Sequence, residues 1–373
     1  MLVTNKQPNP NGQESQRRAT WFKTLNISRL TLASPLAYVI AFLLTFLIGG
    51  VVIYALTGEN PISVYSSFFS YSFFSQYGIL EVLAKATPII IAGAGMIIAF
   101  RCGLWNLGAE GQMAIGAIVA TAIGVNLNLP AGILLPIIFL TSFIGGALWS
   151  GIAGFLKTRF GVHEMLSTLM LNYIALKLLE YMISGPLSMP HPNYPRSSEI
   201  LLQAQMPFLQ YPLNTTFLIA LALIPIVWFI INRTSLGYRL QAVGFGREAA
   251  RLAGMDIAKL TMIVMLISGG ISALGGTVEV VGDFMRMERN VTGGYGFTAI
   301  VVVMLAREEI IAMPFAAFFI SGMLVGASSL TLAGIPASFS HILIGLLLLC
   351  VVFAGYIERW LKQRWEYAGK IAC

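Results

Sequence analysis

Two long stretches of the sequence carry no charge. None of the 46 residues between Glu110 and Lys157 is charged, and neither is any of the 48 between Glu309 and Glu358. A helix needs about 20 mainly apolar residues to cross a bilayer, so each stretch has room for two crossings. Each also has a turn signal in its middle, at 126–130 and at 333–336. The chain is therefore predicted to cross a membrane many times.

Further apolar segments bring the predicted number of spans to ten. Hydrophobic residues make up 57% of the chain and charged residues only 10%, whereas a soluble domain has about 25% charged residues. The expected fold class is an all-α polytopic membrane protein with about ten transmembrane helices. The expected spans are 35–57, 86–101, two within 111–156, 164–183, 215–232, 260–282, 294–306 and two within 310–357.

The placement of lysine and arginine predicts the orientation of these spans. With the N-terminus inside, inside segments hold 18 basic residues and outside segments hold four, as the positive-inside rule requires. We expect a membrane domain at 31–358, between a disordered cytoplasmic tail at 1–30 and a cytoplasmic tail at 359–373. The proline-rich loop 184–213 then lies outside, as a docking surface or as a plain connector. Loop 233–259 lies inside.

Two glycine-rich segments interrupt the apolar pattern at corresponding places. One is 100–112, which contains Asn106, Glu110 and Gln112; the other is 290–297, which contains Tyr295 and Phe297. They fall between the first and second spans of two sets, spans two to five and seven to ten, which start in opposite directions. Such paired interruptions are typical of a solute site at an inverted-repeat interface. The alternatives are tight packing by the glycines and, for Glu110, a structural place in the first turn of a helix.

Polar residues also occur on the span at 164–183. Thr168 and Asn172 are four residues apart, so they share one face of a helix, and Tyr173 follows directly. That face either hydrogen-bonds a neighbouring helix or lines a solute pathway. Farther along the span, Lys177 and Glu180 are predicted to form a local ion pair.

The inside loop 233–259 is predicted to contain a short amphipathic helix at 247–253, closed by Gly254. Such a short helix needs a surface against which to bury its apolar residues. Because these are mostly alanines, which anchor weakly in lipid, a groove in a partner protein is favoured over the bilayer surface. The residues expected to make this contact are Arg247, Glu248, Ala249, Ala250, Leu252 and Gly254.

Several function classes are disfavoured. The three histidines are far apart, and neither a metalloprotease, nor a serine-hydrolase, nor a phosphate-loop motif occurs. The three cysteines are too widely spaced to predict a disulfide framework or a metal site. We therefore expect no catalytic residues, metal or cofactor in this chain, and no nucleic-acid partner.

Four segments in this order carry a family resemblance: GLWNLGAEGQMAIGA (103–117), HEMLSTLMLNYIA (163–175), SLGYRLQAVGFGREAARLAGM (235–255) and GGYGFTAIVVVMLAR (293–307). The chain resembles the permease family of bacterial ABC importers for nucleosides and simple sugars, and is similar to the larger of the two permeases in nucleoside importers. It departs from the family pattern at His163, where Asn is common, and at Arg247, where Pro is common.

The resemblance implies a multi-pass protein of the bacterial cytoplasmic (inner) membrane that works by alternating access. It implies a cytoplasmic ATPase that binds the ATP, a second related permease subunit and an external solute-binding protein. The ATPase would contact the segment 247–254. The alternative is an ion-coupled secondary transporter acting without an ATPase, with Glu110, Glu180 or Asp283 as a proton carrier.

Overall fold

The computed structural model describes residues 40, 43–55, 58–190, 194–332, 342, 344–346, 349–350 and 353. The chain divides into two compact units, one formed by 1–63 with 341–373 and one by 64–340. In the first unit the described helix spans Leu43–Ala55, within the predicted span 35–57. The tails predicted at 1–30 and 359–373 lie outside the described residues.

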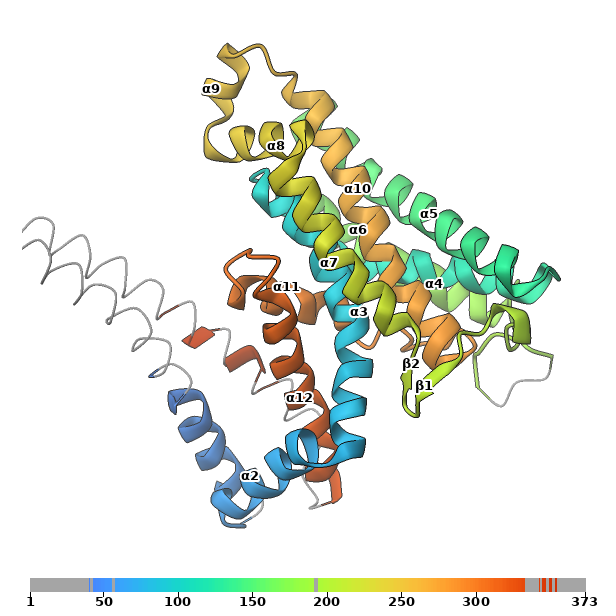
Figure 1. Ribbon diagram of the computed structural model, residues 1–373, viewed down its shortest axis with the longest axis vertical. Coiled ribbons are helices and arrows are strands. Elements are labelled where there is room, and N and C mark those ends of the chain that lie inside the picture. Colours follow the sequence, from blue (N-terminus) through green and yellow to red (C-terminus); the bar gives the residue numbers. More distant parts are fainter. Residues whose placement is uncertain are drawn as a thin grey trace, which may run out of the picture. The chain divides into compact units, whose positions relative to one another are not determined.

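The second unit is a bundle of helices with a small hairpin at one end (Figure 1). In chain order the elements are α2 (Pro61–Phe69, at the division between the units), η1 (Ser70–Phe74), α3 (Gln76–Arg101), α4 (Ala109–Asn126), α5 (Ala131–Phe160), α6 (Glu164–Ser184), η2 (Leu202–Ala204), β1 (Phe208–Gln210), β2 (Leu213–Asn214), α7 (Thr216–Arg233), α8 (Ser235–Phe245), α9 (Arg247–Leu252), α10 (Ile257–Val278), η3 (Glu279–Phe284), α11 (Tyr295–Leu305) and α12 (Met313–Leu332).

Nine of the ten predicted spans fall on described helices, and the tenth lies largely outside the described residues. Within the described residues, five helices are long and apolar enough to cross a membrane: α3, α5, α6, α7 and α10 with η3. The span predicted at 86–101 starts too late, because α3 begins ten residues earlier, at Gln76. The predicted span leaves out the charged residues Glu81 and Lys85. In the structure these two form an ion pair of 3.2 Å along one side of the helix. The total of ten stays a prediction.

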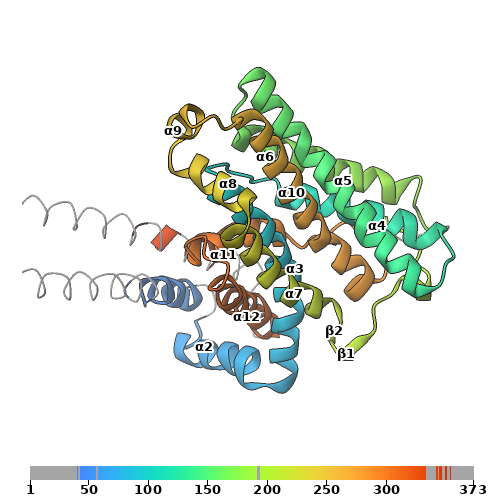
Figure 2. The same cartoon turned by 45° about the horizontal axis from the view of Figure 1, so that its top comes forward.

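Helix α10 lies at the centre of the bundle and packs against α5, α3 and α4 (Figures 1 and 2). The contact with α4 is very close. A Cβ atom on Gly276 would lie 1.9 Å from the carbonyl oxygen of Met113, and one on Gly116 would lie 2.0 Å from that of Ala273. Only glycine allows this approach, which maximises contact between membrane helices that gain little from hydrophobic burial. Gly116 and Gly276 therefore serve the packing of α4 against α10.

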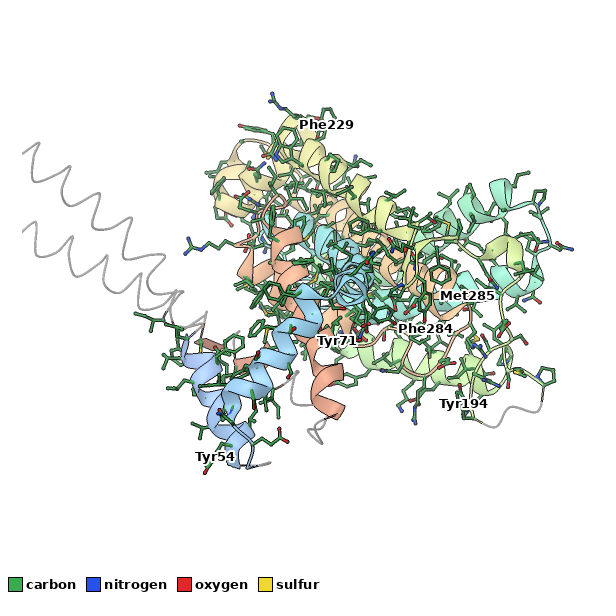
Figure 3. The ribbon with its side chains drawn as sticks, turned by 60° about the horizontal axis from the view of Figure 1, so that its bottom comes forward. Tyr54, Tyr71, Tyr194, Phe229, Phe284 and Met285 are labelled. Atoms are coloured by element: carbon green, nitrogen blue, oxygen red, sulfur yellow. The ribbon has the colours of Figure 1, made fainter. Side chains whose placement is uncertain are left out.

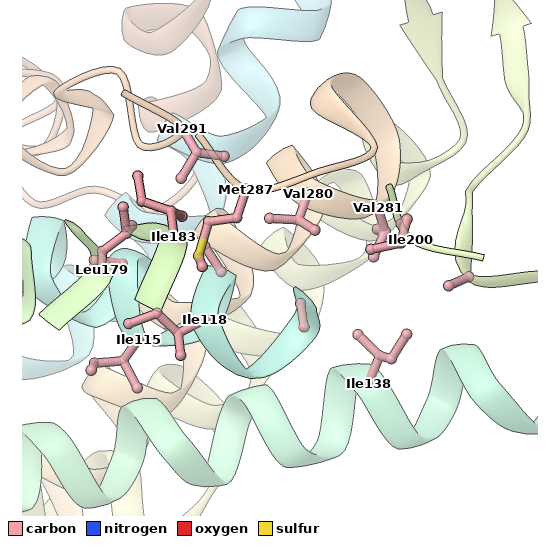
Figure 4. Packing of buried hydrophobic residues seen from close by; sticks show 14 of the residues in the cluster. Ile115, Ile118, Ile138, Leu179, Ile183, Ile200, Val280, Val281, Met287 and Val291 are labelled. Atoms are coloured by element: carbon pink, nitrogen blue, oxygen red, sulfur yellow. The ribbon is translucent and has the colours of Figure 1, made fainter. Parts of the chain in front are cut away.

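A buried apolar cluster joins α4, α5 and α6 to η3 and to the loop after it (Figure 4). Ile115 and Ile118 of α4 face Leu179 and Ile183 of α6, and Met287 covers them from the loop. The outer surface of the bundle is apolar too. Phe229 of α7, for example, is 56% exposed and points away from the bundle (Figure 3). Apolar residues both inside and outside are expected of a bundle that lies in lipid.

The loops gather at two opposite ends of this bundle. At one end, loop 184–213 pairs with the segment after η3: Ile200 N–H donates to the Met285 carbonyl (2.9 Å) and Ser197 N–H donates to that of Met287 (2.9 Å). At the other end, Arg101 donates to Glu309 (2.6 Å) beside α8. Helices α7 and α10 run from one end to the other (Figure 2). The predicted alternation of the spans across a membrane stays a prediction.

The predicted orientation can be tested by labelling single cysteines in a background without the native ones. Leu202 at the hairpin end and Leu252 at the α9 end are matched in exposure, at 81% and 89%. In right-side-out membrane vesicles, Leu202→Cys should react with an impermeant maleimide, and Leu252→Cys should react only after permeabilisation. The opposite pattern would contradict an N-terminus that lies inside.

Candidate functional site

The two glycine-rich interruptions meet in the structure, and a carboxylate joins them. Glu110 lies in the first turn of α4 and is 3% exposed. Its carboxylate accepts a hydrogen bond from the Thr292 hydroxyl (2.5 Å) and another from the Gly296 N–H (2.8 Å). Gly296 belongs to the first turn of α11, where N–H groups have no partner within the helix. Glu110 therefore caps α11 from its own place at the N-terminus of α4. These contacts correspond to the structural alternative that the sequence offered for this residue.

The second interruption has to approach α4 closely to make these bonds. A Cβ atom on Gly296 would lie 2.3 Å from the backbone nitrogen of Glu110 and 2.5 Å from its Cα atom. Helix α11, Tyr295–Leu305, has 11 residues and confirms the short helix predicted at 294–306. At 1.5 Å per residue it is about 16 Å long, well below the roughly 30 Å hydrocarbon core.

A second set of polar contacts holds the loop between α3 and α4. The Asn106 amide donates to Ser268 of α10 (2.8 Å), and its oxygen accepts from the Gln112 amide (2.9 Å). The same oxygen accepts from the Gly108 N–H (3.0 Å). Asn106 and Gln112 are both buried. Because their hydrogen bonds are made within the chain, these two amides fix the course of the loop.

The polar face of α6 serves the same loop. The Asn172 amide donates to the Leu107 carbonyl (2.9 Å), and its oxygen accepts from the Gly111 N–H (2.8 Å). Thr168 accepts from the Leu107 N–H (3.3 Å). Of the two alternatives for this face, hydrogen bonding to a neighbouring segment is the one observed. Nearby, Lys177 and Glu180 form the predicted pair, at 2.8 Å.

Two aromatic residues predicted for the solute pathway lie at the surface of this chain, and their place in a pathway stays a prediction. Tyr173 is 64% exposed on the surface of α6, and Phe297 is 41% exposed on α11. Tyr295 lines a cavity instead, together with residues of α3, the hairpin and η3.

This cavity has a volume of about 180 Å³ and lies toward the hairpin end of the bundle. The polar and titratable residues that line it come from four separate segments: Tyr77, Glu81 and Lys85; Tyr211 and Asn214; Glu279 and Asp283; and Tyr295. Sequence reasoning singled out only Tyr295 and Asp283 from this group. Glu279 carried a usable signal, because it is an acidic residue inside a predicted span, and such residues are functional candidates by default.

The opposite end of the bundle carries the segment that was predicted to contact an ATPase. The expected helix 247–253 is observed as α9, Arg247–Leu252. Sequence reasoning missed α8, Ser235–Phe245, which precedes it. Ala250 is the buried residue of α9, at 4% exposure, whereas Leu252 is 89% exposed and Phe245 is 90% exposed. The two short helices therefore present large apolar side chains on the surface of this chain.

Comparison with known proteins matches residues 78–352 to the family described as the permease component of the branched-chain amino acid transport system. This match covers most of the chain and includes all four segments of the resemblance. The chain belongs to this permease family.

Characterised relatives of this permease include ABC transporter subunits for sugars and nucleosides. The glucose ABC transporter permease of Haloferax volcanii is 34% identical over 89% of this chain and 91% of the relative. A guanosine ABC transporter permease of Bacillus subtilis is 34% identical over 90% of this chain and 98% of the relative. A second guanosine ABC transporter permease of that organism is 27% identical over 64% and 77% of the respective chains. An ABC transporter permease is therefore the class of this protein, and the ion-coupled alternative is not favoured.

The contact between the two interruptions predicts a sharp steric limit in the permease. Gly296→Ala should lower the free energy of unfolding by about 1–3 kcal/mol, because the methyl group would meet the Glu110 backbone. Gly132→Ala in α5 is the matched control, since a Cβ atom there meets nothing within 4 Å. It should be neutral or slightly stabilising. Melting temperatures of the purified variants measure both effects, and equal values would contradict the contact.

Proposed function

We propose that this permease is the membrane-spanning subunit of an ATP-driven importer that moves a nucleoside or a related sugar-containing solute inward. The relatives that span nearly the whole chain are named for glucose and guanosine, which share a polyhydroxylated sugar ring. We place the protein in the bacterial cytoplasmic (inner) membrane, with the hairpin end outside and α9 inside. It would be non-catalytic, with ATP bound and hydrolysed by a partner subunit.

The observation that carries this proposal is the surface of α8 and α9. Phe245 and Leu252 are almost fully exposed, although they are large apolar residues. A six-residue helix is too short to be stable by itself, so a partner surface would stabilise it. Glu248 is exposed in the first turn of α9, where it is available to a basic residue of the partner. A cytoplasmic ATPase with an apolar groove fits these requirements.

Two more partners complete the proposed importer. A second, related permease is supported by Bacillus subtilis, which has two guanosine permeases similar to this chain. An external solute-binding protein would dock at the hairpin end. There the described part of loop 184–213 is folded against the bundle and includes the buried Ile200 and Ala204, which supports its use as a docking surface.

Transport would proceed by alternating access. Closure of the ATPase pair on ATP would move α8 and α9, and these would carry the motion into α3 and α10. The backbone favours such a transfer, because a Cβ atom on Gly244 of α8 would lie 2.3 Å from the carbonyl oxygen of Arg101, the last residue of α3. A movement of α8 is thus passed directly to the end of a long membrane helix.

Variants on α9 test this coupling. Ala249→Trp should abolish solute uptake, because Ala249 is exposed on α9 and a bulky side chain there would hold the ATPase away. Leu252→Asp should lower the amount of ATPase that co-purifies with the permease, since it places a charge in an apolar contact. Uptake into proteoliposomes and recovery of the ATPase are the two measurements.

The matched control is Leu202→Asp, which changes an equally exposed leucine at the hairpin end. It should leave the recovery of the ATPase unchanged. If Ala249→Trp and Leu252→Asp both assemble and import at the wild-type rate, α9 is not the coupling element.

A further inference from the structure

The cavity near the hairpin contains a buried carboxylate without a hydrogen-bond partner. Glu279, the first residue of η3, is 4% exposed and lines the cavity. In the part of the chain that the structure describes, its Oε2 atom has no hydrogen-bond partner. A buried acceptor that bonds neither protein nor water costs stability. Such a group is kept where a ligand completes its hydrogen bonds.

The other charged groups of the cavity do not satisfy Glu279. Lys85 faces it from α3 but is paired with Glu81, at 3.2 Å. Glu81 also accepts from the Tyr71 hydroxyl (3.3 Å). Asp283 lies one turn of η3 farther on and is exposed, so it stands nearer the opening of the cavity. A ligand that carries a hydrogen-bond donor would satisfy Glu279 at this place.

The size of the cavity limits that ligand to a single ring. An engineered apolar cavity of about 150 Å³ binds benzene, and this one has a volume of about 180 Å³. Tyr77 and Tyr211 flank it with exposed rings whose centroids lie 6.4 Å apart, and Tyr295 lines it from the start of α11. Aromatic faces beside carboxylate acceptors suit a ring with apolar faces and hydroxyl groups on its edge.

A metal ion fits the cavity less well. Among the described residues no group of three histidine, cysteine, aspartate or glutamate side chains could hold a metal ion. For a neutral ring, by contrast, the tyrosine hydroxyls are donors for ring and hydroxyl oxygens.

We propose that this cavity binds the sugar ring of the solute, with adjacent hydroxyl groups donating to Glu279 and the ring face lying against the tyrosines. The assignment rests on the proposed function and narrows it, because it names the part of the solute that this subunit recognises. The cavity is too small for a nucleobase together with its sugar. A site for the sugar ring alone would explain why similar permease subunits serve both nucleosides and simple sugars.

The test uses the assembled transporter in nanodiscs without the external binding protein, so that recognition belongs to the membrane subunits. Its melting temperature is measured against increasing adenosine, which has two adjacent hydroxyl groups, and against 2′,3′-dideoxyadenosine, which has neither. Hydrogen bonds from two adjacent hydroxyl groups to Glu279 predict that wild type responds to adenosine at a concentration roughly tenfold lower than to the dideoxy compound.

Glu279→Met removes the acceptor at similar volume and should abolish this preference for adenosine. Without solute, its melting temperature should equal or exceed that of wild type, because an unpartnered buried polar group is gone. Glu279→Gln is the second variant, and it should reduce the preference without abolishing it. The control is Glu180→Met, which changes a carboxylate outside the cavity that is paired with Lys177 and Arg289; it should keep the preference.

A second measurement distinguishes failure of the cavity assignment from failure of the proposed function. It is the uptake of adenosine by the wild-type transporter in the presence of binding protein and ATP. If uptake occurs and both Glu279 variants keep the wild-type preference, the cavity assignment is wrong and the proposed function stands. A lowered melting temperature of Glu279→Met with an unchanged preference would likewise make the carboxylate structural. If the wild-type transporter imports neither nucleosides nor sugars, the proposed function fails and the cavity assignment fails with it.

Discussion

The carboxylate of Glu110 links the two halves of this bundle. It lies at the start of α4 and accepts from the Gly296 N–H at the start of α11, so the positive ends of two helices share one negative group. In a membrane this arrangement has a particular value, because a helix that begins inside the bilayer has no water to satisfy its first N–H groups. Without such a carboxylate, α11 could not start where it does.

The position of α11 in turn determines the rest of the candidate site. Tyr295, its first residue, contributes to the cavity, and the loop before it covers the apolar cluster through Met287. The loop before α4 is held in the same way, by Asn106 and Asn172. Two irregular segments are thus buried inside protein, which is the condition under which non-helical backbone is tolerated at membrane depth.

Much of this architecture could be predicted from the sequence, because membrane helices leave long charge-free segments. Charged pairs and glycines within helices are harder to interpret from the sequence. Glu81 and Lys85 form an ion pair within α3, so a rule that counts charges started that span ten residues too late. Helix α8 was missed because Gly237 and Gly244 break the helical pattern. Both glycines are needed for close backbone contacts, which a single sequence does not reveal.

The candidate site was harder to predict than the fold. Thr168 and Asn172 were correctly placed on one face, but two roles remained open until their partners on the α3–α4 loop were known. The cavity could not be assembled from the sequence, since its lining comes from four segments that are distant along the chain. Tyr295 and Asp283 were singled out one by one, and Glu279 offered a further local signal as an acidic residue in an apolar span.

The glycine contacts between α4 and α10 also restrict how the protein can move. With backbone atoms in direct contact at Gly116 and Gly276, neither helix has side chains that could yield, and sliding by one residue would bring a Cβ atom into the neighbouring carbonyl. Packed interfaces of this kind have discrete arrangements and do not deform continuously. We therefore expect helices α4 and α10 to move together as one rigid pair. Opening or closing of a pathway would then change the contacts that other helices make with this pair and leave the contact between α4 and α10 unchanged.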